Sequence, residues 1–138
     1  MISNIIFGAY LFIIGAVDLM TSSIHLLLLA TGVVPIFLSL FAEGTITLSE
    51  RAMGLVTGLV VMLISLLSRE QIGKGDALLL CVTGIYLGVY GNAILMAWSF
   101  GLAICGSIVL LASRRFSGTM RIPFAPFVFA GYVVMLVA

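Results

Sequence analysis

Charged residues are scarce in this chain. Six of the 138 residues are Lys or Arg and five are Asp or Glu, so charged residues make up 8% of the sequence and hydrophobic residues 63%. Soluble globular domains carry roughly 25% charged residues, and a domain this small would expose much of its apolar surface to water. The composition therefore predicts a membrane protein. A net charge of +1 without a basic or acidic run gives no indication of a nucleic-acid partner.

Residues that bind metals or act as nucleophiles are equally few. Cys81 and Cys105 form no CxxC pair, so a thiolate zinc site is not predicted, and both are expected to be small buried residues. His25 is the single histidine, which excludes a multi-histidine metal site within one chain. The sequence also lacks a recognisable Ser–His–acid spacing and a P-loop. We therefore expect no metal and no cofactor.

Apolar segments make up most of the chain. A membrane-spanning helix needs about 20 apolar residues, with a range of roughly 17–25. Polar residues separate six candidate segments, which are Met1–Val17, Ile24–Phe41, Ala52–Leu67, Ala77–Tyr90, Ala93–Ala112 and Pro123–Ala138. The fourth is short, and the turn after it is predicted at Gly91-Asn92, so a re-entrant fourth segment is the alternative to six passes.

We predict an all-α membrane protein, a bundle of about six transmembrane helices that forms a single domain over residues 1–138. The first segment is expected to be a permanent membrane helix, because it has no basic n-region and no A-x-A cleavage site. Two small-residue pairs predict close helix packing in lipid and are assigned no further function, Gly54 with Gly58 and Gly84 with Gly88.

Basic residues indicate how the chain is oriented. Five of the six fall after the third or the fifth segment, namely Arg69, Lys74, Arg114, Arg115 and Arg121. With six passes these loops share one side, whereas the other side carries only Arg51, Glu43 and Glu50. By the positive-inside rule, the basic loops face the cytoplasm and both termini lie on the extracytoplasmic side of the cell membrane.

Two aspartates adjoin apolar segments. Asp18 ends the first segment, and Asp76 begins the fourth within the polar stretch REQIGKGD. Two passes separate them, so both are expected on the cytoplasmic face. A charged side chain costs about 2.5–3.5 kcal/mol at the centre of a membrane helix, so a carboxylate held there needs a partner or a function. Simpler interpretations stay open: Asp76 caps the following helix, Asp18 is an interface residue in water, and Lys74 only sets orientation.

The alternative is that the two carboxyls act as a pair. Two adjacent carboxyls cannot both ionise readily, so they share a proton. One can then take a proton from water while the other polarises a peptide carbonyl, which allows amide hydrolysis without a covalent intermediate. Gly73 and Gly75 are expected to adopt dihedrals closed to other residues and to let a substrate backbone approach. His25 follows Asp18 by seven residues, two turns of a continuing helix, so we expect a local polar contact there.

Three segments resemble a known family. GKGD at Gly73–Asp76 resembles the GxGD signature of intramembrane aspartic proteases. VDLMTSSIH at Val17–His25 is similar to the first-aspartate segment of type IV prepilin peptidases, and RIPFAPFVFAG at Arg121–Gly131 is similar to the segment that opens their last helix. The segments occur in the family's order and together span nearly the whole chain. His25 and Leu26 stand where the family often has Pro-Asn, and Ala125 replaces a glycine between two prolines.

The resemblance implies a membrane aspartic endopeptidase that removes the leader peptide from prepilins or pilin-like precursors at the cytoplasmic membrane face. Asp18 and Asp76 are then the catalytic pair, and Gly73, Lys74 and Gly75 support the active-site loop. The cysteine-rich insertion of the family members that also methylate their product is absent. Peptidase activity without methylation is therefore implied.

Two functions of other classes stay open. In a small ion- or proton-coupled transporter, Asp18 and Asp76 would bind protons or cations. Transporter acids more often lie near the membrane midplane, whereas these lie at segment ends beside basic residues. A non-catalytic membrane subunit of a pilus or secretion machine is the other alternative, and it leaves the two glycines of GKGD unexplained.

Overall fold

The fold is known from a computed structural model, which describes residues 1–42, 46–68, 73–113 and 122–138. Within these ranges every regular element is an α-helix, which confirms the predicted all-α class. The elements are α1 (Ile2–Thr21), α2 (Leu26–Ala30), α3 (Val33–Ala42), α4 (Leu48–Leu67), α5 (Lys74–Ala112) and α6 (Ala125–Val137).

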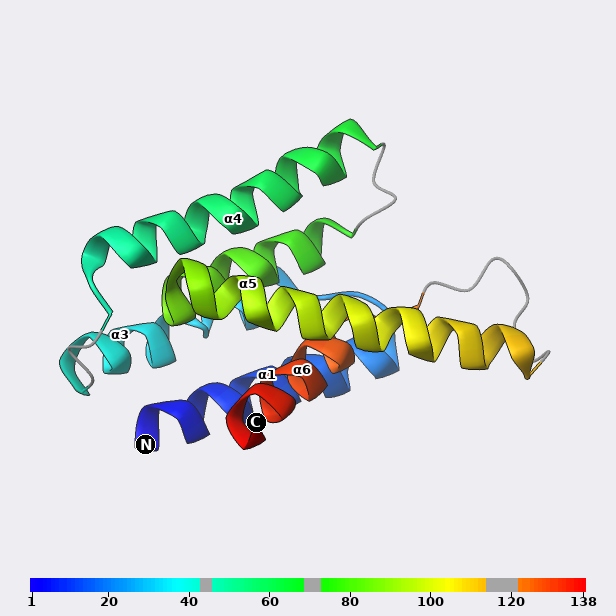
Figure 1. Cartoon of the computed structure of the whole chain (residues 1–138), viewed down its shortest axis with the longest axis horizontal. Helices are drawn as coiled ribbons and strands as arrows, with labels where there is room; N and C mark the ends of the chain where they lie inside the picture. The colour runs from blue at the N-terminus through cyan, green and yellow to red at the C-terminus, as the bar shows by residue number, and fades with distance from the viewer. Residues whose placement is uncertain (43–45, 69–72, 114–121) are drawn as a thin grey trace.

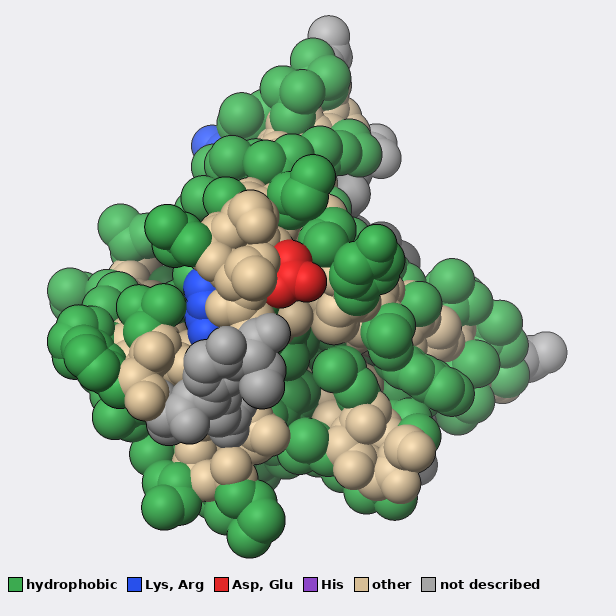
Figure 2. All heavy atoms as spheres, turned by 60° about the vertical axis from the view of Figure 1, so that its left-hand side comes forward, with side chains coloured by type: hydrophobic (Ala, Val, Ile, Leu, Met, Phe, Trp, Pro, Cys, Tyr) green, Lys and Arg blue, Asp and Glu red, His purple; other side chains and the backbone are tan. Residues whose placement is uncertain are grey.

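Apolar side chains cover much of the outside of the molecule. Leu27 is 85% exposed and Phe41 is 78% exposed, and Figure 2 shows one face that consists mainly of hydrophobic side chains. Among the described residues, α1, α4 and α5 are long and apolar enough to cross a membrane, while α6 is shorter. Cys81 is buried as predicted, but Cys105 is exposed, because a side chain in an apolar segment can face lipid instead of a neighbouring helix.

Helix α5 reverses its direction at Gly88. The backbone there has φ 72° and ψ −179°, a conformation that glycine adopts and other residues avoid. In a straight helix Leu80 and Asn92 would lie about 18 Å apart along the axis, yet Nδ2 of Asn92 donates to the Leu80 carbonyl at 3.3 Å. Figure 1 shows the two halves of α5 running back along one another. We call 74–87 the first arm and 89–112 the second arm.

The predicted turn at Gly91-Asn92 is therefore wrong in position. Both residues lie in the second arm in helical conformation, because Gly88 supplies the positive φ that reverses the chain. Asn92 instead joins three helical segments. Its Oδ1 accepts from Oγ1 of Thr83 at 2.7 Å, and its Nδ2 donates to Oγ1 of Thr57 at 2.7 Å. A buried amide with these partners avoids the cost of an unpaired polar group and fixes α4 against both arms.

Helix α4 packs on the first arm through glycines. A Cβ atom added to Gly54 would overlap the carbonyl of Gly84, and one added to Gly58 would lie 2.5 Å from Cα of Cys81. The missing side chains let the two backbones come into contact, which is the role predicted for these small residues. Gly88 has a different role from the one predicted, since it forms the reversal itself.

The second predicted segment, Ile24–Phe41, is divided into α2 and α3. The chain turns at Gly32, where an added Cβ would lie 2.6 Å from Oη of Tyr10. The same Oη donates at 3.2 Å to the carbonyl of Leu29, in the last turn of α2, which also accepts the N–H of Gly32 at 3.0 Å. Pro35 then falls in the first turn of α3, where a missing N–H costs little.

An aromatic cluster joins α1, α5 and α6 near the chain termini. The ring of Phe7 stacks on Tyr86 with centroids 3.8 Å apart and meets Tyr132 edge-on at 5.1 Å. Oγ of Ser3 and Oη of Tyr86 are hydrogen-bonded at 2.8 Å. Figure 1 shows both chain termini in the left-hand half of the molecule. This cluster anchors the beginning of α1, so that the end of α1 lies toward the opposite side of the bundle.

Arg51 is buried within a helix. It is the fourth residue of α4 and is 4% exposed. Its Nη1 donates to Oγ of Ser39 at 2.9 Å and to the carbonyl of Ile85 at 3.1 Å, and Nη2 makes a longer contact of 3.5 Å to the Ser39 carbonyl. Both carbonyls lie in last helical turns, of α3 and of the first arm, where partial negative charge accumulates. One guanidinium therefore complements two helix C-termini.

The prediction that Arg51 and Glu50 are loop charges is wrong. Helix α4 begins at Leu48, because Thr47 and Glu50 form a capping box that satisfies the first N–H groups. The other charges used to predict the orientation lie mostly outside the described residues: Glu43, Arg69, Arg114, Arg115 and Arg121. Orientation in the membrane therefore stays a prediction.

Candidate active site

Three helix ends adjoin at the predicted site. Asp18 lies in the last turn of α1, Asp76 lies in the first turn of α5, and α6 begins at Ala125. Oδ2 of Asp18 accepts a hydrogen bond from the backbone N–H of Ala125 at 3.1 Å. Gly75 adjoins the connection that follows α1, since an added Cβ would lie 2.9 Å from Cβ of Ile24. The connection that follows α1 and the start of α5 therefore adjoin on the right-hand side of Figure 1, and Asp18 is joined to the start of α6.

Phe124 links the start of α6 to the start of α5. Its side chain packs against the hydrophobic cluster that contains Ala77, the residue after Asp76, and against the larger cluster that contains Ala125. Its ring also stacks on Phe100 of the second arm with centroids 5.1 Å apart. The start of α6 is thus in contact with the surroundings of both aspartates.

Asp18 is buried and lies inside helix α1. Its side chain is 4% exposed, so the interpretation as an interface residue in water is wrong. The helix continues past the predicted end at Val17 to Thr21. Ser22 then ends it with a left-handed φ of 50°, and the N–H of Ser22 donates to the Asp18 carbonyl at 2.7 Å. Burial against α6 allows the helix to continue through an acidic residue that the sequence places at its boundary.

Asp76 is the third residue of α5 and is partly buried. The N-cap residue is Gly73, and the helix begins at Lys74 instead of the predicted Ala77. The interpretation of Asp76 as the N-cap is therefore wrong. A carboxylate in the first turn still interacts favourably with the positive end of the helix, so Asp76 has a stabilising role in α5 whatever its chemistry.

Gly73 and Gly75 provide space instead of unusual dihedrals. Gly73 has φ −59°, and Gly75 is helical. The expectation of glycine-only backbone conformations here is wrong, because positive φ among the described glycines occurs at Gly88. A Cβ added to Gly73 would lie 2.8 Å from Oδ2 of Asp76. The glycine therefore leaves room for the carboxylate to lie over the beginning of the helix.

Lys74 and His25 both lie at helix starts. Lys74 is the first residue of α5, and its side chain is exposed. The segment predicted to be an active-site loop is therefore helical from Lys74 onward. His25 is the exposed N-cap residue of α2 and makes no side-chain capping bond. Because α1 ends at Thr21, the two-turn spacing between Asp18 and His25 does not exist.

Sequence reasoning does not identify the N–H of Ala125 as a partner of Asp18. The contact joins positions that are 107 residues apart, and the donor belongs to the backbone. The signal present in the sequence is the pair Pro123 and Pro126, because proline is favoured in the first turn of a helix. Phe124, the N-cap residue, cannot accept a hydrogen bond with its side chain. The start of α6 therefore takes its acceptor from another helix.

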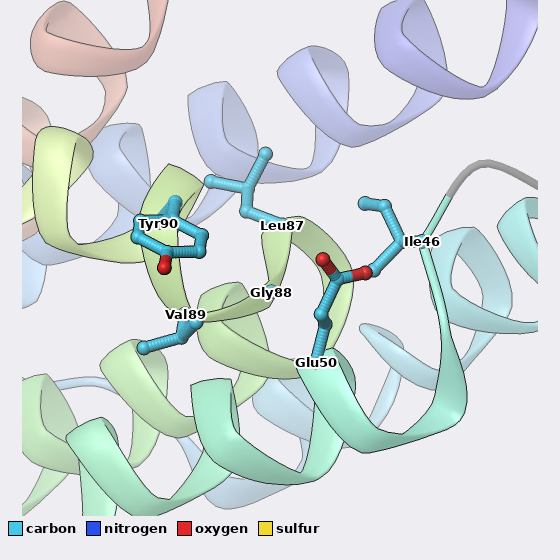
Figure 3. Close-up of a pocket in the computed structure, with 6 residues that line it drawn as sticks. All are labelled: Ile46, Glu50, Leu87, Gly88, Val89 and Tyr90. Carbon is cyan, nitrogen blue, oxygen red and sulfur yellow. The ribbon is translucent and has the colours of Figure 1, made fainter.

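A pocket of about 120 Å³ lies at the other end of the first arm. Figure 3 shows its lining residues, which surround the reversal of α5: Ile46, Glu50, Leu87, Gly88, Val89 and Tyr90. None of the residues predicted for the site lines this pocket. The pocket and the predicted site therefore lie at different ends of the first arm.

Comparisons of the chain with protein-family models, with curated proteins and with solved structures found no match.

Proposed function

We propose that the chain is a membrane aspartic endopeptidase that removes the leader peptide from prepilins or pilin-like precursors at the cytoplasmic face of the cell membrane. Asp18 and Asp76 are its catalytic pair. The observation that supports this most is the hydrogen bond from the N–H of Ala125 to the buried Asp18. It holds a carboxylate where the starts of α5 and α6 adjoin. The resemblance of the sequence to prepilin peptidases supplies the reaction.

The proposed chemistry needs one proton shared by two carboxyls. The ionised carboxylate removes a proton from water, and the protonated carboxyl polarises the scissile carbonyl. The water oxygen adds to the carbonyl carbon, and the C–N bond then breaks as the leaving nitrogen takes up a proton from the pair. Gly73 leaves space for the Asp76 carboxylate, and Gly75 and Lys74 complete this helix start.

Six membrane passes are part of the proposal. In this proposal the two arms of α5, joined at Gly88, are two of the passes, and α2 with α3 together form another. The first arm and α6 are short, about 20 Å each, against a hydrocarbon thickness of about 30 Å. With six passes both termini lie on the extracytoplasmic side. In Figure 1 both termini lie away from the end of α1 and the beginning of α5, which supports this arrangement.

The proposed substrate is a precursor whose short basic leader precedes a hydrophobic helix. Cleavage between the two parts requires a site near the cytoplasmic end of the bundle. The aspartates lie near helix ends, which agrees with that requirement. Without the cysteine-rich insertion of larger relatives, the proposed product is a cleaved pilin that this chain does not methylate.

Leader removal is the direct test of this function. The protein is co-expressed with a pilin-like precursor from its own genome, and the product is followed by mass spectrometry. We expect processing by the wild type and none by Asp18→Asn or by Asp76→Asn. The Asn side chain at position 18 can still accept the Ala125 N–H, so the variant removes the acid while keeping an acceptor. Glu50→Gln, an acid-to-amide change at the other end of the bundle, is the matched control with normal processing.

Normal processing by either aspartate variant would overturn the catalytic pair. If the wild type processes no candidate precursor, an ion- or proton-coupled transporter or a non-catalytic pilus or secretion subunit becomes the better explanation. Proton uptake into liposomes that depends on Asp18 would then distinguish the transporter from the subunit.

A further inference from the structure

We propose that the backbone N–H of Ala125 is a positioning group for the catalytic carboxylate of Asp18. The inference rests on the proposed function and extends it, because it makes the start of α6 part of the active site. The residue involved contributes no side-chain chemistry. Its N–H donates to Oδ2 of Asp18 at 3.1 Å.

Among the first backbone N–H groups of α6, that of Ala125 donates to a residue of another helix. Phe127 and Val128 both donate to the carbonyl of Phe124, at 2.9 and 3.2 Å. Pro126 has no N–H. Ala125 therefore has the one donor in this first turn that needs an acceptor from outside the helix, and Asp18 provides it.

Burial makes this hydrogen bond effective. Asp18 is 4% exposed and Ala125 is 1% exposed, so water has little access to either group. A hydrogen bond to an ionised carboxylate is shorter and stronger than a neutral one, and the positive end of the α6 dipole acts in the same direction. The contact therefore restricts the orientation of the Asp18 carboxylate.

Gly15 allows the two backbones to come close enough for this contact. It precedes Asp18 by one helical turn, so the two residues share a face of α1. A Cβ added to Gly15 would lie 3.3 Å from Cα and 3.4 Å from N of Pro126. Helix α1 thus lies directly against the first turn of α6, and Asp18 accepts the N–H of Ala125, the residue before Pro126.

The start of α6 also packs against the first arm, which carries the second aspartate. Phe124 packs against the cluster that contains Ala77, next to Asp76. A displacement of the α6 start would therefore change the position of Asp18 relative to Asp76. A simple helix cap predicts only a loss of stability when the donor is removed. A positioning group predicts a slower reaction in protein that is still folded.

The test replaces the Ala125 amide by an ester, through incorporation of lactic acid at that position. This removes the N–H and keeps the methyl side chain. We expect kcat for precursor cleavage to fall about tenfold or more, with KM changed less than about twofold, because a hydrogen bond to a charged group is lost. The same ester at Ala130, further along α6 and away from Asp18, is the matched control with nearly wild-type kcat. An ester variant with wild-type kcat overturns the inference, even if its stability is lower.

A second measurement needs no substrate. The chain has two aspartates, so ¹³Cγ-aspartate labelling gives two carboxyl NMR signals, which Asp18→Asn and Asp76→Asn assign. We expect the ester at 125 to move the Asp18 signal more than the Asp76 signal. An unmoved Asp18 signal overturns the inference. A wild type that cleaves no precursor would refute the proposed function, whereas this signal still decides whether Ala125 positions Asp18.

The wild type offers a measurement that does not depend on folding of the ester variant. With ¹⁵N-alanine labelling, the amide of residue 125 is the signal that Ala125→Gly removes. We expect this amide proton to exchange slowly with deuterium and to move more in Asp18→Asn than in Asp76→Asn. Fast exchange in the wild type would contradict the buried contact and overturn the inference.

Discussion

Arg51 donates a hydrogen bond to the carbonyl of Ile85 at 3.1 Å, although 34 residues separate the two. The same guanidinium bonds Ser39 of α3. One buried side chain of α4 therefore joins the end of α3 to the end of the first arm. Its positive charge is complemented by carbonyl groups of two last helical turns, whose partial negative charges add up.

Replacing Arg51 by Met should destabilise the protein. The carbonyl of Ile85 and the Ser39 side chain would lose a donor in a buried place, at a cost of about 1–3 kcal/mol. Thermal unfolding in detergent, followed by circular dichroism, measures the change. Arg51→Lys keeps a cation with a different donor geometry and should recover part of the loss. A midpoint for Arg51→Met equal to that of the wild type would contradict the proposed capping of two helices.

Two glycine-to-alanine changes should differ in sign. A methyl group on Gly54 would overlap the carbonyl of Gly84, whereas one on Gly101 would meet nothing within 4 Å. We expect Gly54→Ala to lose about 1–3 kcal/mol, because two backbones must separate. Gly101→Ala should gain up to about 1 kcal/mol from its higher helix propensity. Unfolding midpoints of the two variants, measured side by side, test the packing, and equal effects would refute it.

The reversal of α5 should depend on Gly88. An alanine there would have to keep φ near 72°, which costs about 1–3 kcal/mol for a residue with a Cβ. Gly88→Ala should therefore unfold at a lower temperature, and Gly101→Ala in the second arm is the control for loss of a glycine as such. Wild-type stability of Gly88→Ala would indicate that the two arms can connect in another conformation.

Gly73 and Gly75 should respond differently to alanine. At Gly73 the added Cβ meets Oδ2 of Asp76 at 2.8 Å, so the carboxylate must move. Gly73→Ala is then expected to lower precursor cleavage at least tenfold while the protein accumulates normally, because a misplaced catalytic group is costly. Mass spectrometry of the precursor measures this. Cleavage at the wild-type rate would separate Gly73 from the proposed site.

At Gly75 the added Cβ meets the side chain of Ile24 at 2.9 Å. The double variant Gly75→Ala with Ile24→Ala should therefore recover whatever Gly75→Ala alone loses, in stability and in cleavage. A double variant no better than Gly75→Ala would show that the helix start tolerates no side chain at this position.

Helices were predictable from the sequence where hydropathy alone decides them. The positions of α1 and α4 agree with the first and third predicted segments to within a few residues at each end. The reversal of α5 was located less well, because the turn was predicted at Gly91-Asn92 and Gly88 was assigned to helix packing. The structure distinguishes the two positions by the positive φ of Gly88, and this backbone conformation could not be predicted from the sequence.

Buried charges were the least predictable feature. A charge near the end of an apolar segment usually indicates a loop, yet Arg51 is covered because its acceptors come from residues 39 and 85. Asp18 was identified as a candidate from its position and from family resemblance. Its partner at Ala125 is a main-chain group on the last helix, so only the folded structure brings the two together.

The two arms of α5 differ in length. They are joined at Gly88, but the first has 14 residues and the second has 24. At 1.5 Å per residue, the second arm runs about 15 Å further. Asp76, near the N-terminal end of the first arm, therefore lies well short of the level where the second arm ends, and Figure 1 shows the second arm continuing past the start of the first. In a bilayer matched to the long arm, Asp76 lies below the surface, and the proposed peptidase would need the scissile bond of its substrate to reach that depth.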